Sequence, residues 1–116
     1  MKTLTSDEIV AVAELTCEQA GLSLPTITIK KIHGGGYNTL TGIRLPAWLL
    51  DRPEPYAIYY VCHELAHLRF LRHNSDFKRF EQVLCAMWGV RITGYSRGVT
   101  GRKGRTYPKA SEIVIQ

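Results

Sequence analysis

The chain has 116 residues, of which 45% are hydrophobic, and a formal net charge of +5 at pH 7. This length fits one domain with a modest core, and no apolar run reaches the ~18 residues that a membrane-spanning helix needs. The first residues lead directly into a polar helix start, so we expect no secretory signal and a cytoplasmic location.

The first element that the sequence predicts is a helix that begins after Thr5. Thr5 and Glu8 have the spacing of a capping box, and Leu4 and Ile9 have that of a hydrophobic staple. Apolar residues then recur at helical spacing, and Gly21 marks the end of the helix.

Two extended runs follow the first helix. Residues 26–32 alternate between apolar and polar, which predicts a strand with one buried face. Glycines at 34–36 interrupt it, and a second run covers residues 37–45. We expect an antiparallel hairpin or meander. Either the edge of this sheet holds an extended peptide, or the sheet only covers a helix. His33, beside the glycines, is not assigned to a metal.

A second helix, for which Asp51 is the expected cap, contains the sequence His63-Glu64-Leu65-Ala66-His67. Its two histidines are four positions apart, so they share one helix face and can hold one metal ion. Glu64 can take a proton from a metal-activated water. Apolar residues occupy nearly every side of this helix, and unpaired polar side chains would be costly there. We therefore predict a zinc site rather than an amphipathic helix with surface histidines.

The motif helix is expected to run to about residues 69–71 and then to break. Helix-capping residues occupy positions 74–76, and a new apolar period begins at Phe77. His73 therefore lies at an elbow between two helices. On a continued helix it would lie about 80° away from His63 and could not close a metal site.

His73 is the predicted third ligand, because a turn at the elbow can bring its imidazole back to the metal. Three histidines leave one position of a zinc ion for water, which is typical of catalytic zinc. Glu81, near the edge of the apolar face of the third helix, is the competing ligand. The alternative for His73 is a surface histidine in a loop. Cys62 points about 100° away from His63 and is assigned to the core.

The other roles of a zinc hydrolase have candidates but no single assignment. Two carboxylates can orient the zinc-binding histidines, namely Asp76 and Glu81. Three residues can stabilise a developing oxyanion, namely Tyr95, Arg91 and Arg97. Aromatic residues within about 60° of His63 on the helical wheel either line a substrate groove or simply pack. They are Tyr56, Tyr59, Tyr60 and Phe70.

The sequence after Gly89 is basic. No acidic residue occurs before Glu112, whereas six basic residues do, namely Arg91, Arg97, Arg102, Lys103, Arg105 and Lys109. Such a run is either a solvated tail or an electrostatic handle for nucleic acid. We therefore divide the chain into a domain at residues 1–95 and a basic C-terminal tail at residues 96–116. The three cysteines form no C-x-x-C pair and indicate buried thiols in a reducing compartment.

The run from His63 to Leu68, with His73 and Phe77 downstream, resembles the SprT-like and YgjP-like zincin metallopeptidases of the Spartan group. Those proteins carry H-E-x-x-H, a third histidine shortly downstream and often an aromatic residue four positions later. Residues 38–51 also resemble their strand and the link into the metal helix. Asn74 stands where Spartan-type proteins usually have glycine, and the chain lacks the four-cysteine zinc ribbon of many relatives.

The resemblance implies an α+β fold with a minimal zincin-like core of N-terminal helix, small antiparallel sheet, HExxH helix and backing helix. It implies Zn²⁺ bound by His63, His67 and His73, with Glu64 as general base. It also implies hydrolysis of peptide bonds in a protein or peptide substrate, which in the Spartan branch is associated with DNA. Two alternatives stay open, a non-catalytic zinc-containing DNA-binding or regulatory module and a zinc hydrolase for a non-peptide bond.

Overall fold

Three α-helices and a set of short strands make up the residues that the computed structural model describes, which are 2–32, 37–39, 42–98 and 106–115. In chain order the elements are α1 (Ser6–Ala20), β1 (Thr26–Lys30), β2 (Tyr37–Thr39), β3 (Gly42–Pro46), the 3-10 helix η1 (Ala47–Asp51), α2 (Glu54–Ala66), α3 (Ser75–Ala86), β4 (Val90–Ile92), β5 (Arg97–Gly98), β6 (Thr106–Tyr107), the 3-10 helix η2 (Ala110–Glu112) and β7 (Ile113–Ile115). The predicted α+β class is confirmed.

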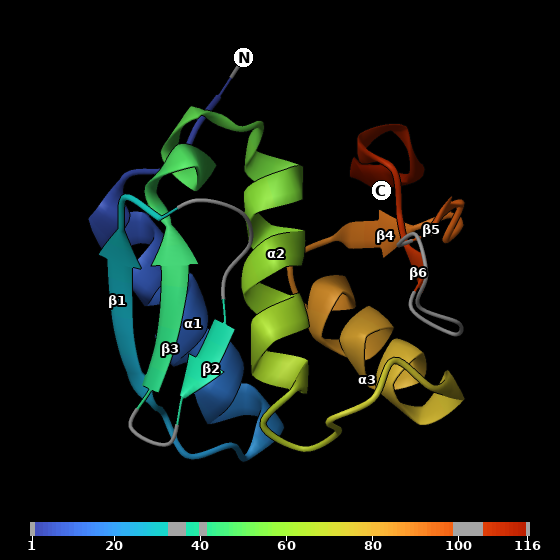
Figure 1. Cartoon of the computed structure of the whole chain (residues 1–116), viewed down its shortest axis with the longest axis horizontal. Helices are drawn as coiled ribbons and strands as arrows, with labels where there is room; N and C mark the ends of the chain where they lie inside the picture. Colours follow the sequence, from blue (N-terminus) through green and yellow to red (C-terminus); the bar gives the residue numbers. More distant parts are fainter. Residues whose placement is uncertain (1, 33–36, 40–41, 99–105, 116) are drawn as a thin grey trace.

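The helix α2 lies at the centre of the molecule (Figure 1). The sheet of β1, β2 and β3 lies on one side of it with α1 behind, and α3 lies on its other side with the C-terminal strands. Helix α2 contacts α1, α3, β4 and β7. Among the described residues, no helix has the length and apolar character that crossing a bilayer requires.

Helix α1 starts and ends at the residues that the sequence predicts. The Thr5 side chain accepts a hydrogen bond from the Glu8 backbone N–H at 3.1 Å, and the Glu8 carboxylate accepts one from the Thr5 N–H at 3.0 Å. Gly21 follows the helix with a φ of 69°, a left-handed conformation that glycine adopts without strain. The predicted capping box and glycine cap are therefore both confirmed.

The three-stranded sheet is mixed, whereas the sequence analysis expects an antiparallel hairpin or meander. Its strand order is β1-β3-β2, with β1 parallel and β2 antiparallel to β3. The second extended run is divided into β2 and β3, which pair with each other, so β1 pairs with the opposite edge of β3. The central β3 buries Ile43 and Leu45. Residues 33–36, which include His33, lie outside the described residues.

The buried side chains of α2 come from nearly all sides of the helix, as its apolar sequence predicts. They include Cys62, and all three cysteines are buried and free. The prediction that Asp51 caps α2 is wrong, because Asp51 ends η1 and the N-cap position of α2 is Pro53, without a side-chain cap. Pro53 and Pro55 carry no backbone N–H, so the first turn has fewer donors to satisfy.

The elbow between α2 and α3 consists of residues 67–74. Helix α2 ends at Ala66, a few residues earlier than expected, because the chain tightens there into a turn. The backbone N–H groups of Leu68 and Arg69 donate to the carbonyls three residues before them, at 3.0 and 3.1 Å. Asn74 then caps α3 by accepting a hydrogen bond from the Phe77 N–H at 2.9 Å. The predicted break and new helix start are confirmed.

The C-terminal residues that the structure describes pack onto the rest of the chain. Strand β7 pairs antiparallel with β4, and Ile113 on β7 belongs to the hydrophobic core with 7% exposure. Strand β6 pairs with β5 through Arg97 and Tyr107. Residues 106–115 therefore contribute to the folded structure, although the sequence analysis places them in a basic tail. The domain boundary at residue 95 stays a prediction.

Candidate metal centre

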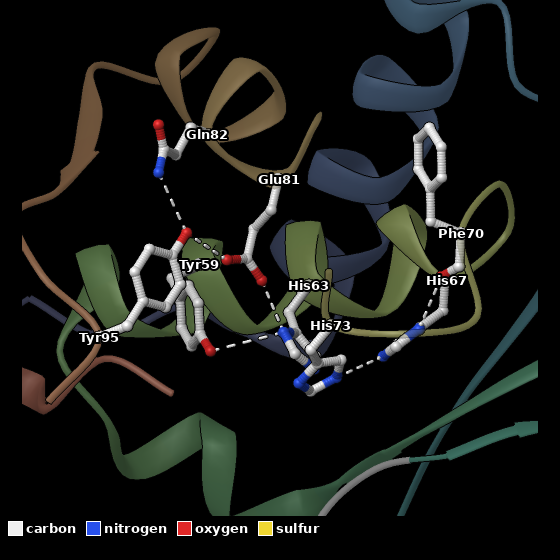
Figure 2. Close-up of polar contacts among 8 residues, drawn as sticks. All are labelled: Tyr59, His63, His67, Phe70, His73, Glu81, Gln82 and Tyr95. Atoms are coloured by element: carbon white, nitrogen blue, oxygen red, sulfur yellow. Dashed lines mark hydrogen bonds and ion pairs between the residues drawn. The ribbon is translucent and has the colours of Figure 1, made fainter. Parts of the chain in front are cut away.

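The structure brings His63, His67 and His73 together. His63 lies in the last turns of α2, His67 is the C-cap residue of that helix, and His73 lies in the elbow. One ring nitrogen from each histidine lies within 4.8 Å of the other two, a spacing that allows the group to hold a metal ion. Figure 2 shows the three imidazoles converging from α2 and from the elbow. We refer to them below as the three-histidine group.

The hydrogen bonds of His63 and His67 decide which ring nitrogen is available to a metal. His63 Nδ1 lies 2.6 Å from Glu81 Oε2, and His67 Nδ1 lies 3.0 Å from the Phe70 carbonyl oxygen. Each of these partners is an acceptor, so Nδ1 carries the hydrogen and the lone pair is on Nε2. A metal-binding histidine usually donates a hydrogen bond from the ring nitrogen that does not bind the metal.

The spacing of the donor atoms also fits a small cation. The Nε2 atoms of His67 and His73 lie 3.1 Å apart. Two nitrogen ligands of a tetrahedral zinc ion, with bonds of about 2.0–2.1 Å, are ~3.3 Å apart. Three neutral imidazoles are a donor set that suits zinc and other first-row metals. The residues present therefore fit a divalent metal ion of this kind.

Glu81, the competing ligand candidate, lies behind His63 rather than in the three-histidine group. Its side chain is fully buried in α3, with 0% exposure of the residue. The Tyr95 hydroxyl donates to its Oε1 at 2.9 Å, and the Gln82 amide donates to the Tyr95 hydroxyl at 3.3 Å (Figure 2). A buried carboxylate needs such partners. Glu81 thus holds the ring orientation of His63, which is the alternative role that the sequence analysis considers for it.

Asp76, the other carboxylate considered for orienting a histidine, does not occupy that position. Its side chain is 63% exposed and lies 3.9 Å from the Arg79 guanidinium on the same helix. It belongs to the first turn of α3, where a negative charge is favourable next to the helix N-terminus. Of the two predicted carboxylates, Glu81 orients a histidine, His63, and Asp76 does not.

Glu64 follows His63 in α2 and is buried, with only 5% of the residue exposed. Burial raises the pKa of its carboxyl above the usual value, and the neighbouring His63 opposes this shift. A carboxyl of raised pKa in such a position is suited to accepting a proton and returning it.

The aromatic residues predicted to flank the metal face have different neighbours. The Tyr59 hydroxyl lies 3.5 Å from His63 Nδ1, and burial raises the pKa of Tyr59 well above its usual value, so that hydroxyl stays protonated. Tyr56 and Tyr60 pack with Trp48 instead, with ring centroids 6.5 and 5.4 Å from the Trp48 ring. Phe70 packs on Phe80 at 5.8 Å. Packing therefore accounts for most of this aromatic face.

Phe77 and Tyr107 complete the surroundings of the three-histidine group. Phe77, in the first turns of α3, stacks on His73 with ring centroids 4.7 Å apart and an interplanar angle of 14°. Tyr107 from β6 lies 4.9 Å from His73 and 5.5 Å from His63, measured between ring centroids. Sequence reasoning missed Tyr107, because nothing in its local pattern separates it from the basic segment around it.

The candidates for oxyanion stabilisation are not equally placed. The Tyr95 hydroxyl is used by Glu81, and burial followed by the Glu81 charge raises the pKa of Tyr95 above its usual range. Arg91 and Arg97 are exposed residues of β4 and β5. Tyr107, by comparison, packs against two members of the three-histidine group, His63 and His73.

Comparison with known proteins gives two matches. The sequence model of the YgjP-like metallopeptidase domain matches residues 2–92 of the chain. A UTP pyrophosphatase of Escherichia coli (strain K12) is 36% identical over 59 residues, which are 51% of this chain and 34% of that protein. The similarity thus spans about a third of that relative's length. No solved structure matches the chain.

Proposed function

The chain belongs to the YgjP-like metallopeptidase domain family, and from this membership we propose that it is a zinc-dependent metallopeptidase that hydrolyses peptide bonds. The observation that carries the proposal is the convergence of three imidazoles, the first of which, His63, directly precedes the buried Glu64 in α2. Such a set can both hold a metal ion and move a proton, which are the two requirements of metal-assisted hydrolysis.

We assign His63, His67 and His73 as the ligands of Zn²⁺. Two of these imidazoles have Nε2 available because their Nδ1 atoms donate elsewhere, and the third reaches them through the elbow. Three protein ligands leave a coordination position open, as in catalytic rather than structural zinc sites. When bound, the ion lowers the pKa of a water molecule and polarises the scissile carbonyl.

We assign Glu64 as the general base. Its carboxylate accepts a proton from the attacking water while the water oxygen bonds to the carbonyl carbon of the peptide. The same proton then passes from Glu64 to the leaving nitrogen as the carbon–nitrogen bond breaks. One water is consumed, a carboxylic acid and an amine are formed, and Glu64 returns to its starting state.

Glu81 is expected to tune metal affinity through His63. Glu81→Gln keeps the shape of the side chain but replaces a carboxylate acceptor with a weaker amide oxygen. The affinity for Zn²⁺ should fall about 10–100-fold, which is typical when the partner of a zinc-binding histidine is changed. Competition with a chromophoric chelator measures this, and Glu18→Gln on the exposed face of α1 is the matched control. An unchanged affinity for Glu81→Gln would contradict the role of Glu81.

The proposed function is tested on the purified full chain by metal analysis and hydrolysis in parallel. We expect one zinc ion per chain and cleavage of an unfolded protein such as casein, detected as new amino termini. The same preparation is incubated with UTP, and released pyrophosphate is measured. Bound zinc with no cleavage of casein or of a mixed peptide library contradicts the proposal.

Hydrolysis of a nucleoside triphosphate is the second candidate function. It is favoured by the similarity to a protein named UTP pyrophosphatase. A metal ion and a carboxylate base can also hydrolyse a phosphoanhydride, and a chain with a net charge of +5 attracts a polyanionic substrate. Release of pyrophosphate from UTP without any peptide cleavage would favour this candidate over the peptidase.

Association with DNA or DNA-bound proteins stays a prediction, as does a cytoplasmic location. Arg102, Lys103 and Arg105 lie outside the described residues. A non-catalytic zinc-containing module, the alternative that the sequence leaves open, predicts bound zinc without turnover in either assay.

A further inference from the structure

We propose that Tyr107 is a catalytic residue that donates a hydrogen bond to the substrate oxygen on which negative charge develops. This inference rests on the proposed function. It gives a role to the C-terminal segment, which lies beyond residues 2–92 matched by the family. It also replaces Tyr95, Arg91 and Arg97 as candidates for oxyanion stabilisation.

The Tyr107 ring lies against the three-histidine group. Its centroid lies 4.9 Å from that of His73 with an interplanar angle of 84°, and 5.5 Å from that of His63 with an angle of 40°. Tyr107 therefore contacts two of the three imidazoles, from a strand that is far from both in sequence. A substrate held at this group would therefore lie next to the Tyr107 side chain, whose phenolic hydroxyl can donate a hydrogen bond.

Two other tyrosines, Tyr59 and Tyr95, lie on the Nδ1 side of His63. The Tyr95 hydroxyl donates to Glu81, and Glu81 in turn binds Nδ1 of His63, the nitrogen that faces away from a metal. The Tyr59 hydroxyl also lies at this Nδ1 atom. Both therefore support the back of His63. Tyr107 instead packs against both His63 and His73.

Several interactions hold the segment around Tyr107 in place. Tyr107 pairs with Arg97 between β5 and β6, and Pro108 after it is buried. The Glu112 carboxylate accepts hydrogen bonds from the Ser96 N–H at 3.1 Å, the Ser96 hydroxyl at 2.6 Å and the Lys109 N–H at 2.8 Å. Strand β7 then pairs with β4. A donor that is already in position stabilises a developing charge without reorganisation cost.

Tyr107→Phe tests the proposal, because it keeps the ring and removes the hydroxyl. We expect kcat for peptide cleavage to fall about 10²–10³-fold, as when one oxyanion donor is removed, with little change in KM. Zinc content and melting temperature should match those of the unmodified protein. Tyr56→Phe, in the aromatic cluster with Trp48, is the matched control and should keep its kcat. An unchanged kcat in Tyr107→Phe would overturn the proposal.

A second measurement separates this proposal from the peptidase assignment. Acetohydroxamate, a small anion that binds metals through oxygen, is titrated into the Co²⁺-substituted protein and followed by visible absorption. Tyr107→Phe should bind it about tenfold more weakly, the loss expected for one hydrogen bond, with the same spectrum before addition. If no peptide is cleaved but this difference is found, the peptidase assignment fails and the position of Tyr107 is supported. Equal affinities, or loss of Co²⁺ binding in Tyr107→Phe, would overturn the proposal.

Discussion

Replacing Glu64 with glutamine should lower the rate of peptide hydrolysis about 10²–10⁴-fold and leave the zinc content unchanged. The amide has nearly the same shape as the carboxylate but cannot accept a proton from water, and this range is the typical contribution of general acid–base catalysis. Because Glu64 is not one of the three converging side chains, its replacement should leave metal binding intact. Initial rates on a fluorogenic peptide and metal analysis of the same samples measure the two effects.

A matched control is the same substitution at a glutamate that has no part in the reaction. Glu18→Gln removes a carboxylate from the exposed face of α1, and Glu18 has no role in the proposed site. Its rate should equal that of the unmodified protein. If Glu64→Gln hydrolysed peptide at the same rate as Glu18→Gln, Glu64 would have no part in the reaction. If Glu64→Gln lost its zinc, its role would be in metal binding instead.

Removing the metal should abolish hydrolysis and also lower the melting temperature. The three histidines come from the end of α2 and from the elbow before α3, so an ion held by them links two parts of the backbone. A ligand that binds only the folded state stabilises it, by about 2.7 kcal/mol at 100 times its Kd. Dialysis against a chelator should remove both the hydrolytic activity and the stabilisation, and added Zn²⁺ should restore them.

His73→Ala makes this test specific to the elbow. It should lose zinc affinity and become insensitive to added Zn²⁺ in thermal unfolding, because only two ligands remain. Arg72→Ala, at the exposed neighbouring position, is the matched control for any disturbance of the loop. Zinc that stabilised His73→Ala as much as Arg72→Ala would remove His73 from the ligand set.

Local signals in the sequence predict both ends of α1 and the start of α3. The capping box at Thr5, the left-handed Gly21 and the cap at Asn74 are each decided by residues within a few positions, and each is confirmed. The break that brings His73 back to the α2 histidines follows from the Asn74 cap. The end of α2 was placed a few residues too late, because the turn hydrogen bonds around His67 and Phe70 compete with the helix there.

Pairing between strands was less predictable. The alternation in residues 26–32 and 37–45 indicates strands and buried faces, but it does not specify which strand becomes the neighbour of which. The structure places β3 in the centre, parallel to β1, and Ile43 and Leu45 of β3 are buried there. The pairing of β7 with β4 is likewise not predictable from the basic sequence after Gly89, because a local pattern does not specify which strands become neighbours.

The sequence by itself determined the motif helix, its break and the proximity of His63, His67 and His73, because helical spacing and capping are properties of neighbouring residues. Only the tertiary structure decided that Glu81 lies behind His63 and that Tyr107 lies against His63 and His73. Those contacts join residues far apart in the chain. They depend on how α3 and the C-terminal strands pack against α2, and no local pattern encodes that packing.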